Sequence, residues 1–182
     1  MNVKARIIHG HSIDLVNACE ADANFILSLR TDVNKSKFLS QTSADVDKQK
    51  KWLNAYALDT EQAYFIIKTK DGKNIGTVRL YDIQGDSFCW GSWILVHDAP
   101  RNASIESAII IYKYALAKGF HRAHFDVRKG NTSVWKFHER FGAVRVAETD
   151  EDYLYEIDEA SILSSLTRYQ KYLPNEITFE DL

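Results

Sequence analysis

The chain has 182 residues, of which 45% are hydrophobic and 26% charged, and its formal net charge is −2. This size suits one domain with a sizeable core, and a near-neutral charge without long runs of one sign argues against a nucleic-acid-binding surface. The two cysteines lack metal-ligand spacing and favour a reducing compartment, and the N-terminal segment lacks the apolar core of a signal peptide. No apolar run is long enough to cross a bilayer. We therefore expect a cytoplasmic protein without a metal.

The first predicted elements are one strand and two helices. Alternating apolar residues over 13–18 predict a strand, and apolar residues at helical spacing over 20–30 predict the helix that follows it. The segment 41–58 carries apolar residues on one helical face and begins with Thr42 or Ser43, either of which suits an N-cap. The chain is thus expected to begin as strand, helix, helix.

A run of strands follows. The segments 63–69, 75–83 and 88–96 are rich in β-branched and aromatic residues, and glycine-containing turns separate them, which predicts an antiparallel meander. The next helix is predicted over 104–118, because apolar residues recur at helical spacing and Gly119 follows as a usual C-terminal stop. Apolar residues on both sides of this helix predict that the sheet and neighbouring segments cover it.

The last third of the chain alternates strands and helices. A strand is expected over 122–128, a short helix over 131–142, and a pair of strands over 143–149 and 152–158. The remaining residues, 159–182, are expected to form a C-terminal helix and an acidic tail. No internal repeat or low-complexity linker divides the chain.

Together these elements predict one α/β domain over residues 1–182, built on a single mixed, mostly antiparallel sheet with helices on both faces. The only clear parallel crossover passes through the helix over 104–118. Ligands of open α/β sheets favour the carboxyl ends of parallel strands. The loops PRNASIES (100–107) and RKGNTS (128–133) are therefore expected beside one crevice.

Residues 126–146, DVRKGNTSVWKFHERFGAVRV, follow a strand, asparagine and helix pattern that resembles the GNAT acetyltransferase superfamily. Supporting segments are ADANFILSLRTD (21–32), NIGTVRLYDI (74–83) and WGSWIL (90–95). The resemblance extends in element order over 10–158 and is nearest to the branch of the ribosomal-protein alanine acetyltransferases. It implies an N-acetyltransferase that uses acetyl-CoA, and a GNAT-like fold in which the parallel strands four and five splay apart.

The resemblance also implies that acetyl-CoA lies in the V-shaped opening between those strands, with its pyrophosphate on the amides of the loop at 100–107. The implied contacts are Ile94, Leu95, Val96, Arg101, Asn102, Ala103, Ser104, Ile105, Glu106, Ser107, Asn131 and Trp135. Relatives write this loop with glycines, which this chain replaces with Ser104 and Glu106. A carboxylate in the first turn of a helix repels a phosphate at the same end, so the direction of Glu106 decides whether the site works.

His138 occupies the position where relatives often carry a tyrosine that protonates the departing thiolate. A histidine can give a proton near neutral pH, because its ordinary pKa is about 6.5. In the alternative interpretation, His138 is a half-buried side chain beside a core helix. Asn131 is likewise open to two interpretations, a cofactor contact and a plain N-cap.

Four residues are candidates for the acceptor side, namely Trp90, Ser92, His97 and Asp82. Alternation places Trp90 and Ser92 on one face of their strand, where an aromatic platform could bind a sugar or a flat base. In the alternative interpretation, the aromatic residues simply pack in the core. His97 ends the strand near the crevice and could relay a proton from the amine. Asp82 could attract a cationic amine or simply form the turn.

The sequence thus predicts transfer of an acetyl group from acetyl-CoA to a primary amine of a small molecule, such as an amino-sugar nucleotide, by direct attack in a ternary complex. The alternative is a GNAT-fold binding or assembly protein whose acetyl-CoA site has decayed, which Glu106 suggests. Neither a nucleic acid nor a membrane is an expected partner. The apolar helix over 104–118 permits a homodimer without requiring one.

Overall fold

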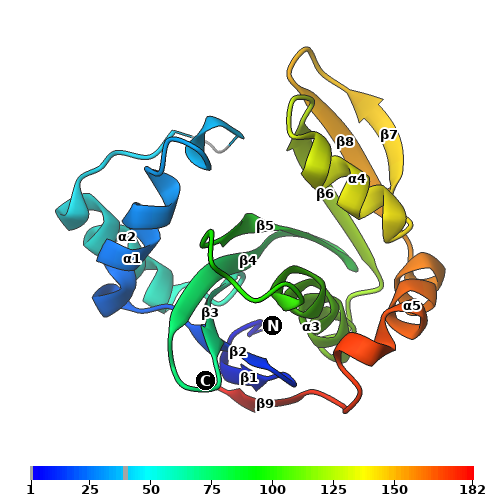
Figure 1. The fold of residues 1–182 in the computed structure, drawn as a ribbon, viewed down its shortest axis with the longest axis horizontal. Coiled ribbons are helices and arrows are strands. Elements are labelled where there is room, and N and C mark those ends of the chain that lie inside the picture. Colours follow the sequence, from blue (N-terminus) through cyan, green and yellow to red (C-terminus); the bar gives the residue numbers. More distant parts are fainter. Residues whose placement is uncertain (1, 39–40) are drawn as a thin grey trace.

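The computed structural model describes residues 2–38 and 41–182, and this described part contains a nine-stranded sheet (Figure 1). The strands are β1 (Ala5–His9), β2 (Ile13–Asn17), β3 (Ala63–Thr69), β4 (Asn74–Gln84), β5 (Ser87–Leu95), β6 (Arg122–Arg128), β7 (Val144–Glu148), β8 (Asp152–Ile157) and β9 (Thr178–Asp181). The helices are α1 (Ala23–Arg30), α2 (Val46–Leu58), α3 (Ala103–Ala117), α4 (Thr132–Arg140) and α5 (Glu159–Arg168). Across the sheet the strand order is β7-β8-β6-β5-β4-β3-β2-β1-β9.

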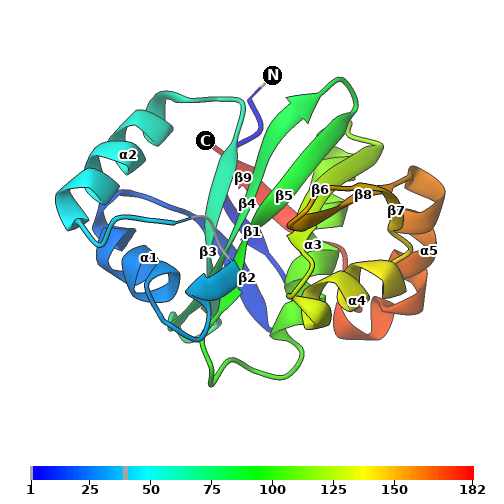
Figure 2. The same ribbon diagram turned by 90° about the horizontal axis from the view of Figure 1, so that it is seen from above.

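The sheet is mixed and carries helices on both faces, which confirms the fold class predicted from the sequence. Helices α1 and α2 cover one face, and α3, α4 and α5 lie on the other (Figure 2). Neighbouring strands of the described sheet are antiparallel except β5 and β6, which are parallel. None of the described helices is long and apolar enough to span a membrane, and the described residues contain no group of three His, Cys, Asp or Glu that could hold a metal ion.

Two short strands at the ends of the chain are missing from the sequence prediction. β1 pairs with both β2 and β9, so the expected acidic tail is in part an edge strand. Phe179 anchors that strand, with its ring 5.1 Å from the ring of Tyr114, and Glu180 lies 3.6 Å from His9. A strand of four residues with one large apolar side chain lacks the alternation on which sequence prediction depends.

The start of α2 also differs from the prediction. Its N-cap is Asp45 rather than Thr42 or Ser43, and the Asp45 carboxylate accepts a hydrogen bond from the backbone N–H of Asp47 at 3.0 Å. The Thr42 hydroxyl oxygen instead accepts a hydrogen bond from Arg30 Nε at 2.6 Å. All three residue types suit an N-cap, so the polar cluster predicts the helix but not its first residue.

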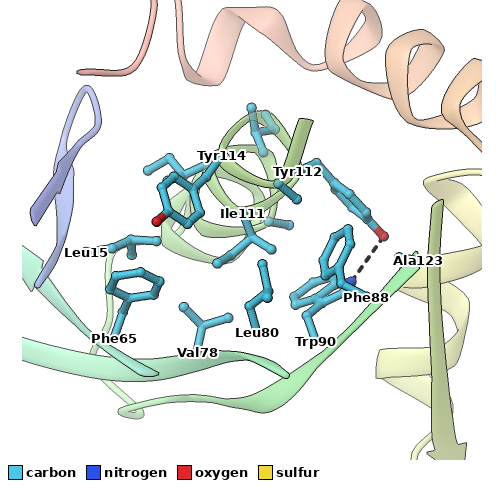
Figure 3. Packing of buried hydrophobic residues seen from close by; sticks show 14 of the residues in the cluster. Leu15, Phe65, Val78, Leu80, Phe88, Trp90, Ile111, Tyr112, Tyr114 and Ala123 are labelled. Carbon is cyan, nitrogen blue, oxygen red and sulfur yellow. Dashed lines mark hydrogen bonds between the residues drawn. The ribbon is translucent and has the colours of Figure 1, made fainter. Parts of the chain in front are cut away.

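Helix α3 lies in the hollow of the curved sheet and is covered on both sides, as predicted. Ile111, Tyr112 and Tyr114 pack against apolar side chains contributed by β2 to β6 (Figure 3). The Trp90 indole N–H donates to the Tyr112 hydroxyl oxygen at 3.2 Å. A smaller apolar cluster that includes Leu53 fills the opposite face of the sheet, below α1 and α2.

A bulge breaks the alternation of β5. The register of β5 against β4 shifts after Gly91, so that Ser92 and Trp93 together stand opposite a single residue of β4. Ser92 adopts a left-handed backbone with φ of 46°. Trp93 therefore turns to the side of Trp90, with their rings 5.2 Å apart, while the Ser92 hydroxyl lies 3.4 Å from Arg30 of α1. The prediction that Trp90 and Ser92 share a face is wrong for this reason.

The parallel strands β5 and β6 touch only near their starts. Ser87 pairs with Arg122 and Phe88 with Ala123, and no further backbone pair joins the two strands in the described residues. Beyond these pairs the strands diverge toward their carboxyl ends (Figure 1). The predicted splaying of the fourth and fifth strands is thereby confirmed.

Glu106, in the first turn of α3, points into the turn between β1 and β2. Its side chain is fully buried, and its carboxylate accepts hydrogen bonds from the backbone N–H groups of His11 and Ser12, both at 2.8 Å, and of Ile13 at 3.3 Å. Gly10 leaves room for this contact, because a Cβ there would lie 2.8 Å from a carboxylate oxygen of Glu106. The carboxylate thus ties the start of α3 to the β1–β2 hairpin.

Glu106→Ala is expected to lower the free energy of unfolding by about 3–5 kcal/mol, since it leaves three backbone N–H groups of the β1–β2 turn, two of them partly buried and one buried, without an acceptor. Glu106→Gln keeps one acceptor oxygen and should lose about half as much. Urea unfolding followed by circular dichroism measures both variants. The control is Glu176→Ala, at a side chain that is 91% exposed, with an expected change below about 0.5 kcal/mol. If Glu106→Ala unfolds like this control, the contact does not support the fold.

Candidate functional site

The opening between β5 and β6 contains a cavity of about 200 Å³, which we call the β5–β6 cavity. Trp90, Trp93 and Phe125 line it together with Asn131 and His138. It lies where the two strands have separated, because their backbone pairing ends near the start of each strand. This is the opening in which the sequence predicts the acetyl donor.

His138 lines this cavity and is only 5% exposed. The rings of Phe125, Trp90 and Trp93 surround it, with centroids at 4.2, 5.1 and 6.2 Å. Burial lowers the pKa of His138 to about 3, and its Nδ1 has no hydrogen-bond partner among the described residues. The imidazole is therefore neutral near pH 7 and holds no imidazolium proton in this state.

Of the three residues predicted to pair with the donor, only Leu95 turns its backbone toward the opening. The Val96 N–H donates to the Ile75 carbonyl oxygen of the β4 side at 2.8 Å, and Ile94 is paired in register with β4. Because alternate residues of an antiparallel strand bond to the same neighbour, the N–H and C=O of Leu95 point away from β4. The Leu95 carbonyl oxygen accepts a hydrogen bond from the Lys35 ammonium group.

The loop at 100–107 presents free amides without any glycine. The backbone N–H groups of Ser104 and Ile105 have no hydrogen-bond partner among the described residues. No residue of this loop has a positive φ, so the absence of glycine causes no backbone strain. Arg101 is exposed at the edge of the loop, and the Glu106 carboxylate is turned toward the β1–β2 turn.

Three other residues of that loop that were predicted to contact the donor instead make contacts within the protein. Ala103 is buried as the first residue of α3, and Asn102 Nδ2 donates to the Ser12 hydroxyl oxygen at 3.1 Å. The Ser107 hydroxyl oxygen accepts a hydrogen bond from the Trp93 indole N–H at 3.0 Å. The bulged strand β5 is thus joined to the first turns of α3 through Trp93.

Asn131 and Trp135, at the start of α4, face different neighbours. Asn131 lines the β5–β6 cavity, and its side chain makes no capping hydrogen bond to the helix. The Trp135 indole N–H donates to the Lys129 carbonyl oxygen at 3.2 Å, and its ring packs edge-on against Tyr153 at 6.0 Å. Of these two predicted cofactor contacts, the structure brings Asn131 to the cavity and packs Trp135 against β8.

A second cavity, of about 390 Å³, lies on the face of the sheet that α1 and α2 cover, and we call it the α1–α2 cavity. Arg30, Trp52, Tyr64 and Arg79 are among its lining residues. Ser92 is the one described residue that lines both cavities. Ligands on the two faces of the sheet would therefore meet at the β5 bulge.

The four residues predicted for the acceptor side do not lie together. Trp90 is 3% exposed and belongs to the core. Asp82 lies near the β4–β5 turn, with its carboxylate 3.1 Å from His124 Nε2, whereas the exposed His97 follows the opposite end of β5. Among the four, only Ser92 lines the α1–α2 cavity.

Arg30 and Arg79 line this cavity but were not predicted as site residues. Arg79 stands in the middle of the apolar strand β4, which is itself a signal, because arginine is rarely buried in a sheet without a specific contact. Arg30 ends α1 as many helix-terminal cations do, so its local sequence does not separate it from a surface residue. Only the fold brings the two arginines to one cavity.

Comparison with known proteins agrees with this geometry. The model of the acetyltransferase (GNAT) domain family matches residues 13–144, which is more than half of the chain. The chain belongs to the GNAT family. It is an N-acetyltransferase, and the GNAT family uses acetyl-CoA as its donor.

This GNAT enzyme is similar to FdhC, a nucleotide-linked sugar GNAT solved in its apo form, at 35% identity and a TM-score of 0.81, with 95% of this chain and 98% of FdhC covered. Spermidine N-acetyltransferase from Vibrio cholerae, in complex with CoA and spermine, shares the fold at 16% identity and a TM-score of 0.76. The match covers 84% of this chain and 98% of that chain. A GCN5-related N-acetyltransferase from Brucella melitensis shares the fold at 16% identity and a TM-score of 0.75, with 92% of this chain and 85% of that chain covered. No curated protein matches the chain. The finer assignment to the ribosomal-protein alanine branch stays a prediction.

His138 gives a stability prediction whose sign follows from its lowered pKa. The pKa of His138 is about 3 in the folded GNAT enzyme, against an ordinary value of 6.5, so the unfolded chain binds the proton first as the pH falls. The stabilisation by neutral His138 is complete above about pH 6.5 and decreases below it, by about 2 kcal/mol at pH 5.

His138→Phe, which suits the aromatic surroundings, should remove this part of the pH dependence. Urea unfolding of both proteins at pH 7 and pH 5 measures the effect. The wild type should lose about 2 kcal/mol more than the variant between these pH values. An equal loss in both proteins would contradict the burial of a neutral imidazole.

Proposed function

We propose that this enzyme transfers the acetyl group of acetyl-CoA to the primary amine of a nucleotide-linked amino sugar, by direct attack in a ternary complex. The observation that carries the proposal is the pair of cavities on the two faces of the sheet, which meet at Ser92. The β5–β6 cavity takes the donor and the α1–α2 cavity takes the acceptor. We place the enzyme in the cytoplasm, where its two free cysteines would stay reduced.

The donor assignment rests on free backbone groups. Leu95 has an N–H and a C=O that β4 does not use, and an amide-containing arm can pair with them as an added strand does. The Ser104 and Ile105 amides lie at the positive end of the α3 dipole, with Arg101 beside them, and this arrangement suits a pyrophosphate. Lys35 now bonds to the Leu95 carbonyl oxygen, so donor binding must share or replace that contact.

The direction of Glu106 removes the reason for the alternative of a binding protein with a decayed donor site. Its carboxylate accepts hydrogen bonds from the β1–β2 turn and is not aimed at the loop amides. A negative charge that is neutralised locally by backbone N–H groups repels a neighbouring phosphate less than a free one. The loop therefore keeps the character of an anion site.

The reaction needs alignment and charge stabilisation more than it needs a strong acid. The amine nitrogen bonds to the carbonyl carbon, the C–S bond breaks, the sulfur takes the electron pair, and the proton released by the nitrogen ends on the thiol. We assign His138 a hydrogen bond from its neutral ring to the sulfur as negative charge builds there. This replaces the expected transfer of a stored proton, because a pKa of about 3 leaves no imidazolium at neutral pH.

The acceptor class is inferred from the likeness to FdhC and from the size of the α1–α2 cavity. FdhC is a nucleotide-linked sugar GNAT and shares 35% sequence identity with this chain over nearly its whole length. The α1–α2 cavity, about 390 Å³, falls in the range usual for small-molecule sites. Its position next to the β5 bulge would bring an amine to the donor from the opposite face of the sheet.

Acetyl-CoA is expected to bind with a micromolar Kd in calorimetry. In a thiol-release assay with an amine panel, a nucleotide-linked amino sugar should give the highest kcat/KM, ahead of the unlinked amino sugar, spermidine and a peptide amine. The nucleotide-linked amine should give the highest kcat/KM because, among these amines, only it fills the whole α1–α2 cavity. Absence of acetyl-CoA binding at millimolar concentration would contradict the proposed donor site, and a preference for spermidine would contradict the proposed acceptor class.

His138→Phe is expected to lower kcat by about 10²-fold while the Kd for acetyl-CoA stays unchanged, because the hydrogen bond to sulfur strengthens only as the C–S bond breaks. His138→Gln keeps an N–H donor and should retain more activity. Single-turnover kinetics and calorimetry measure the two quantities. Full turnover by His138→Phe would show that this side chain only fills the core.

A further inference from the structure

The α1–α2 cavity has a cationic wall. Arg79 from β4 and Arg30 from α1 both line it, and its described lining residues include no aspartate or glutamate. The other residues that it presents, such as Trp52 and Tyr64, are aromatic or neutral and polar. A polyamine would meet only like charge here. The cavity therefore favours a ligand that carries negative charge.

Arg79 is held in place and still keeps free donors. Its Nε donates to the Gln62 amide oxygen at 2.8 Å, its Nη2 donates to the same oxygen, and its guanidinium lies over the rings of Trp52 at 5.1 Å and Tyr81 at 4.6 Å. Its Nη1 has no hydrogen-bond partner in the part of the chain that the structure describes. A planar guanidinium fixed by a neutral amide and two rings, with one edge open, is suited to phosphate oxygens.

Unlike four other arginines, Arg79 has no carboxylate partner in the described chain. Those that form an ion pair with a carboxylate are Arg6, Arg122, Arg128 and Arg145. Arg79 forms no ion pair with any described residue and is half-buried. Burial is the largest effect and lowers the pKa of Arg79, and the nearby Arg30 cation lowers it further, whereas Tyr81, Tyr64 and Asp59 raise it in part. A bound anion would offset both effects.

Tyr64 adds a polar group to the same cavity. Its side chain is 3% exposed and lines the α1–α2 cavity. Its hydroxyl group is buried and makes no hydrogen bond of ordinary geometry with a described residue, although burial raises the pKa of Tyr64 and Arg30 and Thr77 lie near enough to lower it in part. Buried hydroxyl groups in native proteins are nearly always hydrogen-bonded with good geometry, so a bound molecule is expected to supply the well-aligned partner that Arg30 and Thr77 do not. A phosphate oxygen can accept the hydrogen of this hydroxyl group.

We infer that Arg79 binds the phosphate groups of the acceptor, with Arg30 and Tyr64 beside it, so that the acceptor is an amine joined to a diphosphate. The inference rests on the proposed function and gives it a specificity-determining residue. The phosphate end is held at β4 under α1 and α2, and the amine end extends toward Ser92. An amine without phosphate lacks this anchor and is a poor substrate.

The test is calorimetry on the full chain saturated with CoA, which fills the pyrophosphate site of the donor. The titrants are inorganic pyrophosphate and uridine diphosphate, and the wild type should bind both. Arg79→Gln should weaken both by about 10–100-fold, and Arg79→Lys should fall between, because lysine keeps the charge but not the planar fork. Arg6→Gln, which changes an arginine paired with Glu180 at the β1–β9 edge, is the matched control and should bind like the wild type.

The affinity for CoA reports whether each variant is folded and separates the two proposals. A wild type that binds no CoA overturns the proposed function. A wild type that binds CoA but neither titrant, or an Arg79→Gln variant that binds both titrants as the wild type does, overturns the role of Arg79 alone. If Arg79→Gln fails to bind CoA, the Arg79→Lys variant is compared with the wild type instead. Binding of both titrants as tightly as by the wild type would then overturn the role of Arg79.

Turnover gives a second readout that a structural role would not produce. With a uridine-diphosphate-linked amino sugar, Arg79→Gln should raise the KM for the sugar nucleotide by about 10-fold or more and leave the KM for acetyl-CoA unchanged. An equal rise in both KM values would mean that Arg79 supports the fold and would overturn the inference.

Discussion

The angle between the two halves of the sheet is set by packing, because β5 and β6 share only two backbone pairs in the described residues. So short a parallel ladder leaves the carboxyl ends of both strands free to diverge. Helix α3 packs against the strands on one side of the divide, and the rings of Trp93, Phe125 and His138 fill the space between the halves. The unpaired edge of β5 and the cavity beside it both follow from this divergence. The bulge at Ser92 then opens the same strand toward the opposite face.

The buried carboxylate of Glu106 shows how a helix can begin without glycine and still leave its amides free. The β1–β2 turn supplies three backbone donors to Glu106, so the charge is balanced where the turn meets α3. The Ser104 and Ile105 amides stay available as a result. The same contact joins α3 to β1, and β1 pairs with β9, so the start of the helix, the first strand and the last strand are parts of one packed unit.

Strong periodicity made most of this fold predictable, and contacts between distant segments limited the rest. The strands from β2 to β8 and the five helices of the described residues have clear apolar patterns, whereas β1 carries two adjacent isoleucines without alternation and β9 has only four residues. The position of His138 followed from its motif, but its neutral state comes from rings on β5 and β6 that its own helix does not reveal. Alternation alone misplaced Ser92, because a bulge inserts a residue without any local signal. The sequence shows Arg79 as an unusual charge within an apolar strand, whereas Arg30, which lines the same cavity, looks like an ordinary cation at a helix end.

The two cavities share only Ser92 among the described residues, and this near-complete separation affects how the enzyme can evolve. Most of the α1–α2 cavity is built by residues that precede β5, and most of the β5–β6 cavity by residues that follow the start of β5, with Phe38 as an exception. Mutation and selection can therefore change the lining of one cavity while the lining of the other is conserved. Under the proposed assignment of the two cavities, substitutions in the first half of the chain would change the acceptor and leave the donor site as it is. A substitution at Ser92 changes the lining of both cavities at once.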